Sequence, residues 1–64
     1  MPSTPTLQQR EKALKSLVVT PAGRKELQEL AARYQAASGR PRPAGTSVIT
    51  YILVHERGQG LISG

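Results

Sequence analysis

The 64-residue chain contains no cysteine, no tryptophan and no phenylalanine. Without cysteine it has no disulfide and no thiolate zinc site to support so small a domain. Without phenylalanine or tryptophan, the core has to be built from leucine, valine, isoleucine and two tyrosines. A single core in a chain below roughly 70–80 residues rarely supplies more than about 3–5 kcal/mol. Self-association is the support that is left, and we therefore expect a homodimer.

Groups that carry out chemistry are also scarce. One histidine and four glutamates, spread along the chain, form neither a metal-binding cluster nor the paired carboxylates of acid–base catalysis. We expect His55 to be a surface residue and all four glutamates to be solvated (Glu11, Glu26, Glu29, Glu56). Gly58 and Gly60 lack the strand, third glycine and helix of a phosphate-binding loop, and they are typical of a cap and a turn. We expect no enzymatic activity, no metal and no cofactor.

No run of the sequence reaches the 18 or more apolar residues that a membrane span requires. The N-terminus lacks the basic segment and apolar stretch of a signal peptide, so we expect a cytoplasmic protein without membrane association. Residues 1–5, with two prolines, are typical of a disordered tail, and residues 6–63 form a single small domain. The net charge of +5 and the isoelectric point of about 10.5 favour polyanionic partners.

Two helices are predicted before residue 40. Thr6 and Gln9 have the spacing of a capping box and start a helix that runs to Ser16. Thr20 followed by Pro21 starts a second helix that runs to about Ser38 and is closed by Gly39. Leucines lie near one face of the first helix (Leu7, Leu14, Leu17), and the second has an apolar face at helical spacing (Leu27, Leu30, Ala31, Tyr34).

The segment from Thr46 to Arg57 is compatible with two structures. Its apolar residues lie at helical spacing, with Thr46 or Ser47 as a cap and Gly58 as a stop, so a helix is favoured (Val48, Ile49, Ile52, Leu53). Its strand formers alternatively predict a strand from Thr46 to Val54 that pairs with Leu61 and Ile62. Leu17, Val18 and Val19 are a further short run prone to strand formation. The expected fold is mainly α, with three helices, short β segments and a helix-turn-helix-like order; the alternative is α+β.

The loop between the second and third segments combines charge with stiffness. Arg40 and Arg42 alternate with Pro41 and Pro43, so both guanidinium groups project from an extended backbone. Such arginines favour contacts with phosphates, to which Arg57 would add. If the following segment is a helix, four polar side chains lie off its apolar face (Ser47, Thr50, Tyr51, His55). The serine, threonine and tyrosine among them are candidates for contacts in a DNA groove.

Two families resemble parts of this chain. Leu30-Ala31-Ala32-Arg33-Tyr34 is similar to the second helix of the DNA-binding domain of GntR-like winged-helix regulators, and Thr46-Ser47-Val48-Ile49 through Gly60-Leu61-Ile62-Ser63 is similar to their recognition helix and the entry to the wing. This resemblance implies that Ser47, Thr50 and Tyr51 contact the major groove. Glu56 stands where that family usually has an apolar residue.

The chain also resembles ribbon-helix-helix proteins. In that resemblance Leu17, Val18 and Val19 correspond to a ribbon that pairs across a dimer, and two helices follow. Both resemblances imply DNA binding.

The sequence therefore predicts a small, basic DNA-binding protein, such as a transcriptional regulator. Its expected contacts are Arg40, Arg42, Arg57 and the polar side chains of the third segment (Ser47, Thr50, Tyr51). The alternative is a protein-interaction module, an adaptor or small inhibitor, that docks on an acidic partner through the same basic loop. A strand from Thr46 to Val54 would favour this alternative, because an exposed strand pairs readily with another chain.

Overall fold

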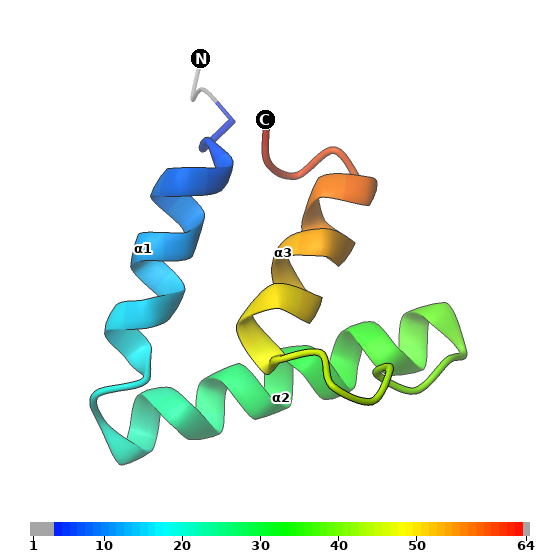
Figure 1. Ribbon diagram of the computed structural model, residues 1–64, viewed down its shortest axis with the longest axis horizontal. Coiled ribbons are helices and arrows are strands. Elements are labelled where there is room, and N and C mark those ends of the chain that lie inside the picture. Colours follow the sequence, from blue (N-terminus) through cyan, green and yellow to red (C-terminus); the bar gives the residue numbers. More distant parts are fainter. Residues whose placement is uncertain (1–3, 64) are drawn as a thin grey trace.

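The computed structural model of the protein describes residues 4–63, which form three helices (Figure 1): α1 (Leu7–Leu17), α2 (Pro21–Ser38) and α3 (Val48–Gly58). In the view of Figure 1, helices α1 and α3 lie side by side and run in opposite directions, and α2 crosses below them. Within residues 4–63 the β structure is confined to one isolated bridge, between Thr6 and Ser63. The mainly α class and its three helices are confirmed.

Side chains at the helix starts follow the predicted pattern. The Thr6 hydroxyl accepts a hydrogen bond from the Gln9 backbone N–H at 3.1 Å, and the Gln9 side chain accepts one from the Thr6 N–H at 3.0 Å. The Thr20 hydroxyl accepts from the Gly23 N–H at 3.0 Å, with Pro21 in the first position of α2. Each cap stabilises its helix by about 1 kcal/mol, because it satisfies a backbone donor that the helix itself cannot pair.

Helix α2 ends at the predicted glycine. Gly39 adopts a left-handed conformation with φ of 71°, and its N–H donates to the Gln35 carbonyl at 2.9 Å. Glycine reaches this conformation without a steric penalty. The end of α3 is a Schellman motif, in which Gly60, with φ of 75°, donates to the Arg57 carbonyl at 3.1 Å and Leu61 donates to the Glu56 carbonyl at 2.9 Å. Gly60 therefore turns the chain, as predicted.

The segment that was compatible with two structures is a helix. Ser47 caps it by accepting a hydrogen bond from the Thr50 N–H at 3.1 Å. The alternative prediction, a strand from Thr46 to Val54 that pairs with Leu61 and Ile62, is wrong. Strand propensity loses because helical spacing buries Ile52 and Leu53 in one core, whereas alternation would place these neighbours on opposite faces.

The core lies where the three helices meet. Six apolar side chains are buried there, and they come from all three helices and the C-terminal segment (Leu14, Leu27, Ala31, Ile52, Leu53, Ile62). Partly buried residues pack around them (Leu7, Leu17, Leu30, Tyr34, Val48, Ile49, Tyr51). The apolar faces predicted for all three helices are therefore confirmed.

The turn between α1 and α2 contains the run that was prone to strand formation. Leu17 ends α1, while Val18 and Val19 belong to a tight turn and form no strand. Gly23 explains how close the helices come at this turn: a Cβ atom there would lie 2.0 Å from the Leu17 carbonyl oxygen. The Arg24 guanidinium donates a hydrogen bond to the Val18 carbonyl at 2.8 Å, and this bond from α2 restrains the turn further.

Residues at the start of α1 are hydrogen-bonded to the segment that follows α3. The Ser63 N–H donates to the Pro5 carbonyl at 2.9 Å, and the Leu7 N–H donates to the Ser63 carbonyl at 2.7 Å. A disordered tail was predicted for residues 1–5, and residues 1–3 of it lie outside the described residues. Of the three helices, none has both the length and the apolar content that crossing a membrane requires.

Candidate nucleic-acid interface

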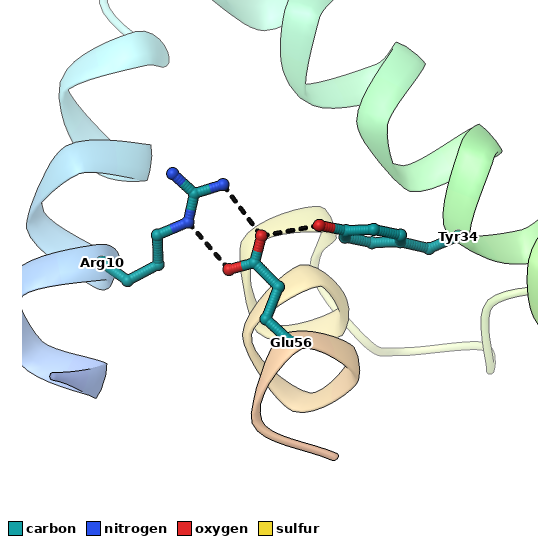
Figure 2. A network of polar contacts seen from close by, with 3 residues as sticks. All are labelled: Arg10, Tyr34 and Glu56. Atoms are coloured by element: carbon teal, nitrogen blue, oxygen red, sulfur yellow. Dashed lines mark hydrogen bonds and ion pairs between the residues drawn. The ribbon is translucent and has the colours of Figure 1, made fainter. Parts of the chain in front are cut away.

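Among residues 4–63, Glu56 is the one buried residue with a charged side chain. It lies on α3 with 3% of its surface exposed, so the expectation of a solvated carboxylate is wrong. Arg10 of α1 donates to it twice, from Nε to Oε1 and from Nη2 to Oε2, each at 2.8 Å. Tyr34 of α2 donates its hydroxyl to Oε2 at 2.7 Å (Figure 2). One carboxylate therefore links all three helices.

These contacts set the protonation of the group. Burial alone would raise the pKa of Glu56, but the hydrogen bonds from Arg10 and Tyr34 outweigh burial and hold the pKa below its ordinary value. The carboxylate is therefore ionised at neutral pH and compensated by the Arg10 guanidinium. Its negative charge is withdrawn from the surface of α3.

The rings of Tyr34, Tyr51 and His55 form one cluster. The rings of Tyr34 and His55 stack with centroids 4.2 Å apart and an interplanar angle of 16°. The ring of Tyr51 lies 6.4 Å from that of His55, tilted by 33°. Both Tyr51 and His55 are half-buried, so the expectations of a surface histidine and of a Tyr51 lying clear of the apolar face are wrong. The tyrosine ring covers core side chains because it is large and mostly apolar.

Positive charge is uncompensated over the C-terminal half. Residues 30–64 contain four arginines (Arg33, Arg40, Arg42, Arg57) and a single carboxylate, Glu56. Because Glu56 is buried and paired with Arg10, it does not offset the exposed arginines. Over residues 4–63, neither Arg40, Arg42 nor Arg57 forms a salt bridge. This part of the surface is therefore electropositive.

Two shallow grooves meet at Val54, whose side chain on α3 is 65% exposed. The first, of about 220 Å³, lies between α3 and the 39–45 loop and is lined by Arg40 and Tyr51 among others. The second, of about 210 Å³, lies between α3 and α1 and is lined by Thr50 and Arg57. Glu11 borders this second groove, with its carboxylate 3.9 Å from the Lys15 ammonium.

The structure thus brings together four of the six predicted contact residues. Arg40, Thr50, Tyr51 and Arg57 line the grooves around Val54, and we call this set of five residues the Val54 surface. Spacing could have identified Val54, since it lies between Thr50 and Arg57 at intervals of four and three residues, on the same helix face. Val54 was not among the predicted contact residues.

The other two predicted residues line neither of these two grooves. Arg42 is exposed in the loop and borders neither groove. Ser47 lines a different groove, with Val18 and Arg24. Its hydroxyl is also engaged in the cap, because it accepts from the Thr50 N–H and donates to the Thr50 hydroxyl at 2.8 Å. Ser47 is therefore primarily a helix cap.

Comparisons of this chain with models of known protein families, with curated proteins and with solved structures give no match.

Proposed function

We propose that the protein binds duplex DNA through the Val54 surface and the neighbouring Arg42. The observation that carries this proposal is the charge distribution. Three exposed arginines form no salt bridge within residues 4–63 (Arg40, Arg42, Arg57). The one carboxylate of residues 30–64, that of Glu56, is buried against Arg10. A polyanion gains most from such a surface, because each neutralised phosphate releases bound counterions. A transcriptional regulator in the cytoplasm is the role that fits this activity.

The contacts divide into two kinds. Arg40, Arg42 and Arg57 would contact phosphates, which supply affinity and position the protein on the duplex without reading its sequence. Thr50 and Val54 lie one helical turn apart on the exposed face of α3, and they would reach base edges. A threonine hydroxyl bonds to base edges, and an apolar side chain contacts the thymine methyl group, so this pair suits a groove that contains thymine.

The alternative of a protein-interaction module loses one of its supports. It depended in part on an exposed strand from Thr46 to Val54 that could pair with a partner's strand. In the helix, backbone donors and acceptors of that segment bond along the helix axis, so the segment has no strand edge with which a partner's strand could pair. Docking on an acidic protein through the arginines alone stays open as the second outcome of the experiment below.

The test is a binding titration with a short fluorescent duplex at low salt. We compare the wild-type chain with the double variant Arg40→Gln/Arg42→Gln, which removes two charges and keeps polar side chains. The control is Lys12→Gln/Lys25→Gln, which removes the same charge from exposed positions on α1 and α2 that line neither groove. We expect the arginine variant to lose at least about tenfold in affinity, and the lysine variant clearly less.

Equal losses in the two variants would show that net charge matters and that the Val54 surface does not. An undetectable interaction of the wild-type chain with any duplex at roughly 50 mM salt would eliminate the DNA proposal. If the chain then bound an acidic polypeptide such as polyglutamate through the same arginines, the protein-interaction reading would replace it. Circular dichroism of each variant verifies that the helices are intact.

A further inference from the structure

We infer that the turn between α1 and α2 and the apolar groove beside it form the interface of a homodimer. The groove has a volume of about 250 Å³ and opens between the turn, α2 and the start of α3. Four apolar residues line it (Val18, Leu27, Val48, Ile49). Three polar residues complete the lining (Arg24, Gln28, Ser47). Arg24 is the one charged residue of the lining. The groove shares no lining residue with the Val54 surface.

The turn beside the groove exposes two apolar side chains, which we call the apolar projection. Val18 and Val19 are 40% and 77% exposed, although both are large apolar side chains. Hydrogen bonds hold their backbone in place, from the Arg24 guanidinium to the Val18 carbonyl at 2.8 Å and from the Thr20 N–H to the Leu17 carbonyl at 3.4 Å. The close approach at Gly23 adds to this restraint. The valines are therefore presented in a defined geometry, which reduces the entropy lost on association.

The chain exposes more surface than a compact monomer of its mass. Its solvent-accessible surface is 4753 Å², whereas a compact monomer of 6.9 kDa exposes roughly 4000 Å². The radius of gyration of 11.7 Å likewise exceeds the roughly 10.7 Å expected of a compact 64-residue domain. The excess of about 750 Å² is spread over the whole chain, and an interface of standard size, which buries roughly 800 Å² on each partner, would cover an area of that order.

A second copy of this chain fits these features better than another partner. A two-fold interface is self-complementary, and a projection next to a groove of the same apolar character can pair with its own image. Two copies, each with a net charge of +5, repel each other, so a patch with few charges is where they can meet. Within residues 4–63, Leu14 and Ile52 are the only apolar side chains below 2% exposure, so the core is small and association would add to it.

The test is the mass of the chain in solution, measured by sedimentation equilibrium over a range of concentrations. We expect the wild-type chain to approach twice 6.9 kDa as the concentration rises. Val19→Lys should raise the dimer dissociation constant at least about tenfold. Val54→Lys is the matched control, because it places the same charge at a valine of similar exposure on the Val54 surface, and we expect it to leave the dimer intact.

A wild-type chain that stays at 6.9 kDa at every concentration would overturn the inference, and so would a Val19→Lys chain that dimerises as well as the wild type. Methyl resonances give a second measurement that needs no substitution. Those of Val18 and Val19 should move on dilution, while those of Val54 and Leu61 should not; the reverse pattern would place the interface on another surface. Neither measurement involves DNA, so its result does not depend on the proposed function.

Discussion

Arg10 of α1 and Glu56 of α3 are joined by two parallel hydrogen bonds of 2.8 Å, although 46 residues separate them in the chain. The Glu56 side chain is almost fully buried, and the Arg10 side chain is about a third exposed. The pair links α1 to α3, and the hydrogen bond from the Tyr34 hydroxyl to Glu56 links both helices to α2 (Figure 2). It also removes the one carboxylate of the C-terminal half from the surface, so the stability of the fold and the charge of the proposed interface depend on the same residues.

Replacing Arg10 should strongly destabilise the protein. Arg10→Met keeps much of the side-chain volume but leaves the buried carboxylate without its counter-charge. Breaking a buried pair in this way costs about 3–5 kcal/mol, and the partial exposure of Arg10 places the expected loss near the lower end of that range. The loss is comparable to the whole stability of a chain this short. The measurement is urea denaturation followed by circular dichroism, with Lys12→Met, an exposed position on the same helix, expected to change little.

The stability of the fold should fall in acid because of Glu56. The folded pKa of this carboxyl lies below its ordinary value of 4.5, since the hydrogen bonds from Arg10 and Tyr34 outweigh the opposing effect of burial. The resulting stabilisation is complete above pH 4.5 and is lost as the pH falls through the folded pKa. Thermal unfolding from pH 6 to pH 3 measures the loss, over roughly the range in which carboxylates titrate. Glu56→Gln should flatten the profile; an unchanged profile would assign the acid sensitivity to other carboxyls.

Tyr34 should ionise only in strong alkali. Burial, together with its hydrogen bond to Glu56, raises the pKa of its hydroxyl from 10.0 to about 12. A raised folded pKa means that the stabilisation is present below pH 10 and is lost as the pH rises through about 12. In a Tyr51→Phe variant, Tyr34 is the one remaining tyrosine, and ultraviolet absorbance then reports its ionisation alone. A midpoint near 10 would mean that the hydroxyl is not held against Glu56.

Two glycines in helices should respond to alanine in opposite directions. Gly23→Ala places a methyl group 2.0 Å from the Leu17 carbonyl oxygen, so the turn between α1 and α2 has to open. We expect a loss of about 2–3 kcal/mol in the free energy of unfolding, as for overpacked cores. Gly58→Ala meets nothing within 4 Å at the end of α3 and should stabilise the protein by about 0.5–1 kcal/mol. Chemical denaturation of both variants tests the pair; a stable Gly23→Ala chain would contradict the close approach.

Local signals were sufficient to predict the first two helices. Thr6 with Gln9, Thr20 with Pro21, and Gly39 act on backbone groups within four residues of themselves, so the sequence around them contains the whole interaction. The third helix needed more than local preference. Its strand-forming residues are overridden by burial of Ile52 and Leu53 against the other two helices, which neighbours in sequence do not reveal.

The polar network could not be predicted in the same way. Arg10, Tyr34 and Glu56 meet only because three helices pack together, and their separations in sequence give no spacing rule. One clue was available: Glu56 lies on the apolar face of its helix, four residues after Ile52, where an apolar residue was expected. Of the predicted contacts, Arg40, Thr50, Tyr51 and Arg57 gather on one surface because loop and helix meet there, whereas Ser47 is held in its cap.

The salt dependence of duplex binding tests the central claim most directly. The association constant of the wild-type chain is measured by fluorescence anisotropy from roughly 50 to 200 mM salt. If Arg40, Arg42 and Arg57 each neutralise one phosphate, log K should fall against log salt with a slope of about −2.7 per protomer. The Arg40→Gln/Arg42→Gln variant should retain about a third of that slope. A slope near zero, or a slope that these two substitutions leave unchanged, would contradict the assignment of this surface to DNA.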